Sequence, residues 1–599
     1  MKNNPLVKLF GALWHYSAGN QKIVILFWCM FVLNEAVNIV VQPLLTAKIL
    51  NSIQSHKGVN EGNLLTLFGY LGLMLCATLF FWMLHGPGRI LERTNAFKGK
   101  IEYRKFLLGG VMNLPLEWQV EHHSGDTIEK IKEGTSALFD FGSSTFVILY
   151  SLTRLVVCFG ILAYHSHLAV LVAFSMMLVS AWIIMRFDRI LIPQYRDLSR
   201  AENKISESVT DATSNISTVI ILRVEKVVFN AIVKKLEKPF GLFVTNIKLS
   251  EWKWFLTNFC CRIMVCLSLG VYFWQQSRSH GVFEIGVYYL ILSYLERVSE
   301  LFNRFCEMYG DIVIRRTRVM NAEDLSKDFK TTTSFANHVL PPDWQELQIR
   351  NLSFSYHGQD GNMHLNNISL SLGLGENIAL IGGSGSGKTT FLKLIRDLYS
   401  PQKLSLSVDG TTIPDGFEGI SRAIALVPQD PEIFSNTIEW NITLGGDYDR
   451  TLITQFTDMA CFTDVLNTLP QKDEDGIDHG GFGCSVKEKG VVLSGGERQR
   501  LALARGLLAC QDKDIVLLDE PTSSLDSTRE MQVYQNIFEG FKKKTIISTI
   551  HRLHLLPLFD TIYLFDKGKI IARGTLRELL RTSPEFQTLW SEYNKYQTL

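Results

Sequence analysis

The chain has 599 residues, of which 46% are hydrophobic and 20% charged, and its formal net charge is +1. This balance argues against nucleic acid as a partner, because nucleic-acid-binding proteins usually carry a strong basic excess. The ten cysteines show no paired CxxC spacing, so neither a zinc site nor thiol redox chemistry is indicated. The length would allow about three or four soluble domains. Hydropathy instead divides the chain near residue 320 into a membrane half and a soluble half.

Apolar stretches in the first half predict six membrane-spanning helices. Residues 63–88 and 155–185 contain no Asp, Glu, Lys or Arg, and about 20 apolar helical residues cross a hydrocarbon core of ~30 Å. The second stretch is long enough for two crossings joined by a very tight turn, because YHSH at residues 164–167 interrupts it. The spans are expected at residues 23–48, 63–86, 142–163, 167–186, 254–275 and 282–304.

Basic residues predict the orientation of these spans, since Lys and Arg concentrate in cytoplasmic loops. The segments after spans two and four are rich in both, whereas the opposite loops contain little more than Lys57 and Arg278. Both termini and the soluble half are therefore expected in the cytoplasm, and the N-terminus shows no secretory signal. The two basic segments are expected to continue the spans as helices tens of ångströms beyond the membrane. Ordinary solvated helical loops are the alternative.

Several charged residues fall inside the predicted spans, where they usually pair or face a cavity. Glu35 lies ~18 Å from the cytoplasmic side and Arg154 ~15 Å from the outer side, at 1.5 Å per helical residue, so the two can share a depth. We expect them either to pair or to line a substrate cavity. Other candidates for this cavity are neighbours at i,i+3 and i,i+4 in span six, namely Glu296, Arg297, Glu300 and Arg304.

A polar stretch at residues 321–344 separates the two halves and is interpreted as a linker. It contains TTTS at residues 331–334 and two consecutive prolines at 341 and 342. Apolar and polar residues then roughly alternate over residues 345–356, which predicts a half-buried strand. The sequence is thus expected to form a transmembrane domain over residues 1–320 and a soluble domain over residues 345–599.

The first chemical motif of the soluble half is GGSGSGKTT at residues 382–390. It follows a short apolar strand at residues 377–381 and begins a helix, so its backbone N–H groups can surround phosphates at a helix N-terminus. We expect Lys388 to reach the β- and γ-phosphates and Thr389 to coordinate Mg²⁺. The predicted ATP-binding loop comprises Gly382, Gly383, Ser384, Gly385, Ser386, Gly387, Lys388, Thr389 and Thr390.

Two further motifs complete the predicted chemistry. Residues 515–518 form a buried-strand pattern that delivers Asp519 and Glu520 to its end. One carboxylate for Mg²⁺ and an adjacent one to polarise water suit phosphoanhydride hydrolysis. The signature segment LSGGERQR, residues 493–500, places two glycines after a serine at the start of a helix, which is a second anion-binding end. Two phosphate-binding elements predict ATP held between two protomers.

Together these motifs make the chain resemble a half-transporter of the ATP-binding cassette (ABC) family, of the six-span exporter type, over essentially its whole length. Bacterial lipid flippases and multidrug half-transporters are similar. The resemblance implies an all-α six-helix transmembrane domain with long cytoplasmic helical extensions. It also implies a following α/β P-loop NTPase domain of the ABC type with a helical subdomain. ATP and Mg²⁺ are the implied cofactors.

The resemblance also implies roles for individual residues. Tyr356 matches the aromatic residue that stacks on adenine, and Gln429 matches the glutamine that joins the metal and the nucleotide site to the membrane half. Glu488 matches the acidic residue of the loop that couples the domains. The remaining matches are Ser494, Gly495, Gly496 and Glu497 at the partner's ATP, Asp519 at the metal, Glu520 as catalytic base, Asp526 in the loop across the dimer, and His551 as γ-phosphate sensor.

The sequence departs from the family pattern at two places. Glu497 stands where Gln is usual, and Lys487 and Lys489 flank Glu488 where Gly and Arg are usual. Neither departure affects the expected catalytic pair of Glu520 and His551. We therefore expect a competent site and a homodimer with two equivalent ATP sites, since two-fold pairing is the commonest closed symmetry.

The expected function is ATP-driven export or flipping of an amphipathic or hydrophobic substrate, such as a lipid, a drug-like compound or a peptide. The cargo rests on fold-level analogy, which says little about specificity. The alternatives are an importer built on the exporter architecture and an ATP-gated channel or regulator. Expected partners are a second identical protomer and membrane lipids, with no nucleic acid. The expected location is the inner membrane of a bacterium, with the ATP-binding domain in the cytoplasm.

Overall fold

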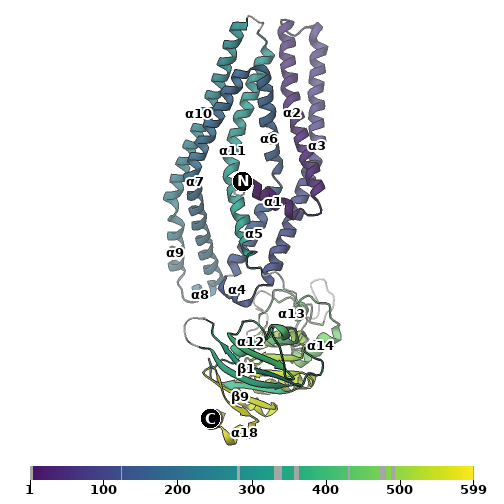
Figure 1. Cartoon of the computed structure of the whole chain (residues 1–599), viewed down its shortest axis with the longest axis vertical. Helices are drawn as coiled ribbons and strands as arrows, with labels where there is room; N and C mark the ends of the chain where they lie inside the picture. The colour runs from purple at the N-terminus through teal and green to yellow at the C-terminus, as the bar shows by residue number, and fades with distance from the viewer. Residues whose placement is uncertain are drawn as a thin grey trace. The chain divides into compact units, whose positions relative to one another are not determined.

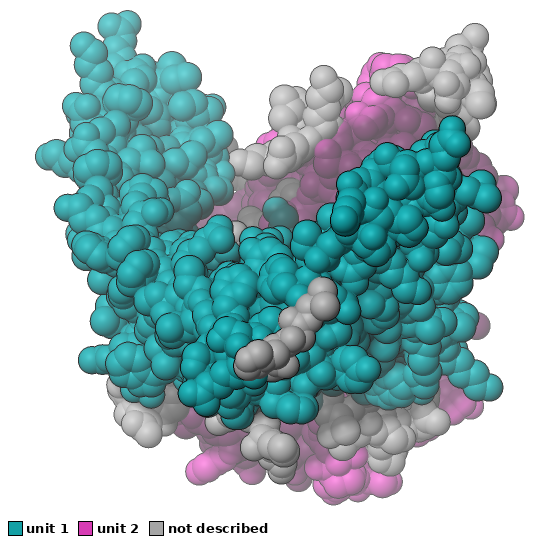
Figure 2. Space-filling view, turned by 90° about the horizontal axis from the view of Figure 1, so that it is seen from above, with its two compact units in different colours: residues 1–114, 122–329 teal, residues 115–121, 330–599 magenta. Residues whose placement is uncertain are grey.

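The computed structural model describes residues 5–122, 124–279, 283–329, 340–356, 363–429, 432–470, 480–486 and 493–597. The chain divides into two compact units, coloured separately in Figure 2. Unit 1 comprises residues 1–114 and 122–329, and unit 2 comprises residues 115–121 and 330–599.

Unit 1 is built entirely of helices in its described residues (Figure 1). Two of them, α3 with 52 residues and α7 with 48 residues, are about 70 to 80 Å long at 1.5 Å per residue, more than twice the thickness of a hydrocarbon core. These helices therefore extend well beyond a membrane. The helices are α1 (Pro5–Tyr16), α2 (Gln21–Ser55), α3 (Glu61–Met112), α5 (Ser124–Gly142), α6 (Thr145–His165), α7 (His167–Ser214), α8 (Ile216–Ile221), α9 (Glu225–Glu237), α10 (Phe240–Ser279) and α11 (Ile285–Leu325).

Five stretches of the described residues are long and apolar enough to cross a membrane. Helix α11 is not among them, because charged residues interrupt the segment in which the sixth span is predicted. The sixth span thus remains a prediction. Helix α11 also extends through Leu325 into the predicted linker, of which residues 330–339 lie outside the described part of the chain. The five stretches are Gln21–Ser55, Glu61–Met112, Ser124–His165, His167–Ser214 and Glu225–Arg278.

A single residue, Ser166, connects α6 to α7. Its backbone is extended, with φ −159° and ψ 103°, and its Oγ accepts a hydrogen bond from the backbone N–H of Ala169 at 3.2 Å. The same hydroxyl donates to Gln275 Oε1 of α10 at 2.6 Å. Helices α7 and α10 lie side by side (Figure 1). This connection therefore ties three helices together at one end of unit 1.

Two amide side chains of α2 cap the start of α11. The side chain of the N-cap residue Glu284 makes no capping hydrogen bond to the first N–H groups of α11, which lack intrahelical acceptors. Gln54 Oε1 accepts from the backbone N–H of Ile285 at 2.9 Å, and Asn51 Oδ1 accepts from that of Gly286 at 2.7 Å. Their amide nitrogens donate in return to the Phe283 carbonyl at 2.7 Å and to Glu284 Oε2 at 3.1 Å.

Gly286 permits this close approach of α2 and α11. A Cβ atom there would lie 2.5 Å from Asn51 Oδ1 and would also collide with the carbonyl oxygen of Ala47. We expect Gly286→Ala to destabilise the protein by about 1–3 kcal/mol, the usual cost of overpacking. Thermal unfolding in detergent measures this. Gly270→Ala in α10 is the control, because no atom lies within 4 Å of its added methyl. Equal unfolding temperatures for the two variants would contradict the packing argument.

Unit 2 contains two sheets and several helices (Figure 1). A four-stranded antiparallel sheet has the order β2-β1-β4-β5, and a six-stranded sheet has the order β10-β9-β3-β8-β7-β6. The strands are β1 (Glu346–Phe354), β2 (Leu365–Gly373), β3 (Asn377–Gly382), β4 (Lys403–Val408), β5 (Thr411–Thr412), β6 (Ile424–Val427), β7 (Ile515–Asp519), β8 (Thr545–Thr549), β9 (Thr561–Asp566) and β10 (Lys569–Gly574).

The larger sheet positions the functional residues. Its strands β9, β3, β8, β7 and β6 are parallel, and every residue of β7 and β8 is buried, as expected for strands covered on both faces. The carboxyl ends of parallel strands lie at one edge of the sheet, where ligands bind.

The α-helices in the described residues of unit 2 are α4 (Leu116–Glu121), α12 (Lys388–Ile395), α13 (Ile438–Thr443), α14 (Arg450–Met459), α15 (Thr463–Thr468), α16 (Gly495–Ala509), α17 (Ser527–Gly540), α18 (Leu576–Thr582) and α19 (Pro584–Gln597).

Helix α4 belongs to unit 2 although its sequence lies between two helices of unit 1. Its Glu117 carboxylate contributes to the electrostatic surroundings of Tyr399. Burial first, then the Tyr356 hydroxyl and the Glu117 carboxylate, raise the pKa of Tyr399. By sequence this segment falls in the predicted membrane half, since nothing in its composition marks it as part of the soluble unit.

Candidate nucleotide-binding and hydrolysis site

The phosphate-binding loop connects β3 to α12, and its shape requires glycine. Gly382, Gly385 and Gly387 have φ values of +143°, +76° and +105°, a region that favours glycine. A Cβ atom on Gly382 would collide with the Phe565 carbonyl oxygen, and one on Gly387 would lie 2.7 Å from a Leu365 methyl carbon. The sequence GGSGSG therefore sets a loop whose backbone can approach a phosphate closely.

Lys388 is folded over this loop. Its Nζ donates hydrogen bonds to the carbonyl oxygens of Gly382 at 2.9 Å and Gly383 at 3.1 Å. Burial lowers the pKa of Lys388, while the Glu520 and Asp519 carboxylates act in the opposite direction. The amine is thus held at the place where an incoming polyphosphate would meet it.

The carboxylates at the end of β7 meet three predicted partners. Thr389 Oγ1 donates to Asp519 Oδ1 at 3.1 Å. Gln429 Nε2 donates to Glu520 Oε2 at 3.0 Å, and His551 Nε2 lies 2.6 Å from Glu520 Oε1. Residues from three separate parts of unit 2 therefore converge on the two carboxylates at the end of β7. This arrangement can hold a metal at Asp519 and a water molecule at Glu520.

The donors near Asp519 fit Mg²⁺. Mg²⁺ prefers oxygen ligands and is usually bound by one or two protein groups together with water and phosphate. The Thr389 hydroxyl and the Asp519 carboxylate lie in contact, and the Gln429 amide lies against the neighbouring Glu520 carboxylate. No group of three or more His, Cys, Asp or Glu residues that could hold a metal is found in the described chain. Bound with ATP, Mg²⁺ would neutralise charge on the phosphates.

The predicted adenine-stacking residue Tyr356 is 37% exposed. Its ring packs edge-on against the rings of Phe354, His364 and Tyr399, with centroid distances of 4.9, 5.0 and 5.1 Å. Its hydroxyl donates to Thr390 Oγ1 at 3.2 Å. His364 and Tyr399 were not predicted as part of the site, because neither belongs to a nucleotide motif and their ring contacts with Tyr356 depend on the tertiary fold.

The signature segment begins α16. Ser494 caps this helix, and its Oγ accepts from the backbone N–H of Glu497 at 3.3 Å. Glu497 Oε2 in turn accepts from the backbone N–H of Ser494 at 2.7 Å, and that bond lowers the pKa of Glu497. The unusual carboxylate thus forms a capping box. A Cβ on Gly495 would meet no atom within 4 Å, whereas one on Gly496 would lie 3.3 Å from the Ser524 carbonyl oxygen.

The loop between β7 and α17 is fixed by two residues that the sequence analysis missed. Gln499 accepts from the backbone N–H of Ser524 at 2.7 Å and donates to Ser523 Oγ at 3.0 Å. Arg552 Nη1 donates to the Leu525 carbonyl at 2.7 Å. The loop leads to Asp526, which caps α17 through the backbone N–H of Arg529 at 2.9 Å.

The predicted coupling residue Glu488 lies outside the described residues.

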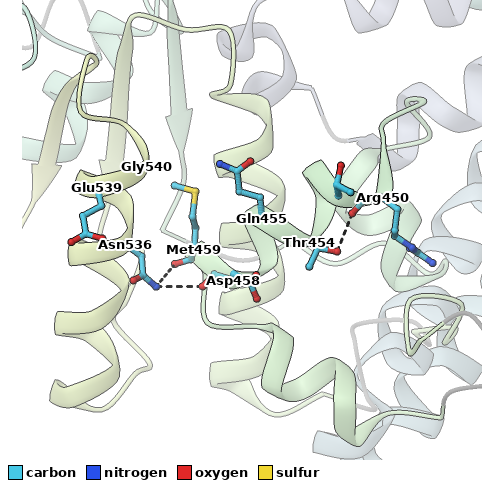
Figure 3. Close-up of a pocket in the computed structure, with 9 residues that line it drawn as sticks. Arg450, Thr454, Gln455, Asp458, Met459, Asn536, Glu539 and Gly540 are labelled. Atoms are coloured by element: carbon cyan, nitrogen blue, oxygen red, sulfur yellow. Dashed lines mark hydrogen bonds between the residues drawn. The ribbon is translucent and has the colours of Figure 1, made fainter.

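A groove between α14 and α17 is separate from this chemistry. It encloses about 740 Å³ and is lined by polar side chains such as Arg450, Asp458 and Asn536 (Figure 3). Asn536 Nδ2 donates to the carbonyl oxygens of Asp458 at 3.3 Å and Met459 at 3.5 Å. A smaller cavity of about 240 Å³ is lined by Glu520 and His551 together with Thr549. We therefore expect hydrolytic chemistry at the smaller cavity, where the predicted Glu520 and His551 lie.

In unit 1 the structure brings Glu35 and Arg154 together. Arg154 Nε and Nη2 donate to Glu35 Oε1 at 2.9 and 2.7 Å, and the Glu35 side chain is 1% exposed. Glu300 Oε2 lies 4.0 Å from Arg154 Nη1. Neither Glu296 nor Arg297 forms an ion pair within the described part of α11. Of the candidate cavity residues, Glu35 and Arg154 thus form a structural pair.

Comparison with known proteins identifies the family. The ABC transporter transmembrane region matches residues 24–298, and the ABC transporter domain matches residues 365–523. The chain belongs to the ABC transporters, of the exporter-type half-transporter class. It is a multi-pass membrane protein that couples ATP hydrolysis to transport. The predicted family and fold class are confirmed.

Relatives differ in cargo. The mitochondrial iron-sulfur clusters transporter ATM1 of Chaetomium globosum is 28% identical over 80% of this chain and 79% of its own length. The ATP-dependent lipid A-core flippase of Ralstonia nicotianae is 36% identical, but over 39% of this chain and 38% of its own. A solved bacterial Atm1-family ABC exporter with ATP bound has the same fold, with a TM-score of 0.80, 21% identity and coverage of 96% and 99% of the two chains.

Proposed function

We propose that this transporter exports or flips an amphipathic or hydrophobic substrate as a dimer of identical chains. The observation that carries the proposal is the convergence of Gln429, Glu520 and His551 at 2.6–3.0 Å in a chain that also holds its own transmembrane unit. In the proposed cycle, two ATP molecules close the nucleotide units of the dimer and turn the substrate cavity outward. Hydrolysis, with Glu520 polarising the attacking water, resets the transporter.

Exposed apolar surface at α8 supports the dimer. Helix α8 buries none of its residues, and Ile216, Ile220 and Ile221 are 48%, 56% and 79% exposed. Contiguous exposed apolar surface of this kind marks an interaction site. This helix lies between the predicted spans four and five and therefore on the expected cytoplasmic side. We propose that a second, identical protomer covers the exposed face of α8. The presence of both Glu520 and His551 favours two equivalent sites and therefore a symmetric dimer.

The substrate class is proposed from the composition of α11. Charged side chains at i,i+3 and i,i+4 positions, among them Glu296, Arg297 and Glu300, occur on a helix that otherwise packs apolar residues such as Tyr294 and Val298 into unit 1. A substrate with both charged and apolar parts suits this mixture. One relative is named as an ATP-dependent lipid A-core flippase, which supports a lipid as substrate. Iron-sulfur cargo, named for other relatives, is the competing class.

The orientation and membrane are also part of the proposal. The Lys and Arg distribution favours a cytoplasmic nucleotide unit. We propose the inner membrane of a bacterium, because a bacterial flippase is among the relatives. The mitochondrial relatives make a mitochondrial membrane the competing location.

A reconstitution experiment tests the function. We expect lipids or apolar compounds to raise the ATPase rate of the protein in proteoliposomes several-fold, and ATP to drive the stimulating compound away from the nucleotide side. The Glu520→Gln protein in the same vesicles is the control for transport without hydrolysis. Movement of the compound toward the nucleotide side would identify an importer, and ATP-dependent ionic current would identify a channel. Full ATPase activity in a monomer would contradict the dimer.

A further inference from the structure

Thr549 is a buried hydroxyl beside the catalytic carboxylates. It is the last residue of β8 and is 1% exposed, and its neighbour Ser548 is fully buried. Two consecutive hydroxyl residues at the end of a fully buried parallel strand are unusual, because such strands are mostly apolar. Buried hydroxyl groups need hydrogen-bond partners. Ser548 finds its partner in the hydroxyl of Tyr534, at 2.8 Å.

The partners of Thr549 are Asp519 and Glu520. The backbone N–H of Glu520 donates to Thr549 Oγ1 at 2.9 Å, and Thr549 Oγ1 lies 2.9 Å from Asp519 Oδ1. An amide N–H can only donate, so the single hydroxyl proton of Thr549 is directed to the Asp519 carboxylate. Strand register explains the contact, since Asp519 and Thr549 are paired across the parallel strands β7 and β8.

The two hydrogen bonds of Thr549 hold the backbone of Glu520 and the carboxylate of Asp519 in place. Glu520 has φ +46°, a left-handed conformation that residues other than glycine rarely adopt and that surrounding contacts must hold. Asp519 Oδ1 receives a second hydroxyl from Thr389 of the phosphate-binding loop. Two residues beyond Thr549, His551 lies 2.6 Å from the Glu520 carboxylate. Strand β8 thus contacts both carboxylate residues from one side.

We propose that Thr549 is a positioning residue for ATP hydrolysis. Its hydroxyl fixes the Asp519 carboxylate for the metal and the backbone of Glu520 for the attacking water. The inference rests on the roles proposed for Asp519 and Glu520, and the family resemblance assigned no role to Thr549. Misplacement of a reacting group by about 1 Å can cost on the order of 100-fold in rate.

Three variants of the full-length protein in lipid vesicles test the proposal. Thr549→Val keeps the shape and removes both hydrogen bonds, and we expect kcat to fall about 10- to 100-fold with the KM for ATP within about twofold. Thr549→Ser retains the hydroxyl and is expected to keep kcat within about threefold. Ser548→Ala is the matched control, since it removes a buried hydroxyl from the same strand without contact to either carboxylate. It is expected to lower the unfolding temperature and to leave kcat within about threefold.

A binding measurement separates positioning from general damage. Titration with a fluorescent ATP analogue is done with Mg²⁺ and with EDTA. In Thr549→Val we expect the affinity gain from Mg²⁺ to shrink several-fold while the affinity in EDTA is unchanged. If this variant does not fold, Thr549→Ala is used in its place. An unchanged kcat in Thr549→Val, or an equal loss in Ser548→Ala, would overturn the inference. Should Glu520→Gln hydrolyse normally, the base assignment fails separately, and the Mg²⁺ titration alone decides on Thr549.

Discussion

Glu520→Gln is expected to bind ATP and to hydrolyse it roughly 100-fold more slowly or worse, the usual contribution of a positioned general base. The amide keeps the size of the side chain and one acceptor oxygen, which can still accept the hydrogen bond that Gln429 donates at 3.0 Å in the native protein. It loses the charge that polarises water. Phosphate release measures the rate, and binding of a fluorescent ATP analogue measures the affinity.

The control for this change is Glu539→Gln. Glu539 is an exposed residue of α17 that lines the groove of Figure 3, and the same chemical change there is expected to leave the rate within about twofold, as for surface substitutions generally. Unchanged turnover in Glu520→Gln would overturn its assignment as the catalytic base. A large loss of the hydrolysis rate in Glu539→Gln would instead indicate that the groove takes part in catalysis.

Glu35→Gln is expected to destabilise unit 1 by about 3 kcal/mol, because it leaves the largely buried Arg154 charge with only the exposed Glu300 carboxylate, 4.0 Å away, as a partner. The side chains are 1% and 14% exposed, and two guanidinium nitrogens contact one carboxylate oxygen. Unfolding in detergent, followed by circular dichroism, measures the loss. Substrate-stimulated ATPase activity of the surviving protein is measured in parallel.

Two controls accompany this prediction. Glu102→Gln breaks an exposed pair with Lys105, whose side chains are 57% and 68% exposed, and is expected to cost under about 1 kcal/mol. The double variant Glu35→Gln/Arg154→Gln is expected to recover part of the loss, since the buried charge is also removed. If Glu35→Gln left both stability and stimulated ATPase unchanged, neither a structural pair nor a substrate contact would be supported.

The family and the fold class were predictable from the sequence because their signals are local. Glycines at positive φ in the phosphate loop, Gly385 among them, leave a readable spacing, and long apolar runs leave a readable hydropathy. Spacing at 1.5 Å per residue also brought Glu35 and Arg154 to a common depth, although it left open whether they pair. The structure shows the pair.

The missed residues act through contacts between distant parts of the chain. Thr549 contacts Asp519 because of the register between β7 and β8, and no spacing within one strand reveals a register. The ring centroids of Tyr399 and Tyr356 lie 5.1 Å apart, although the two residues belong to different segments of unit 2. Gln499 lies inside the signature segment, but its contact with Ser524 depends on how α16 packs. Such residues can be found only once tertiary contacts are known.

The one-residue connection at Ser166 limits how α6 and α7 can move. A connection without slack prevents the two helices from sliding along each other, whereas a longer loop would absorb such a slide. The remaining freedom is a rotation about the joint. Since Ser166 also bonds Gln275 of α10, we expect the three helices to pivot about this point, with α7, 48 residues long, transmitting motion from its far end. A displacement at the far end of α7 therefore reaches this end of unit 1 as a tilt.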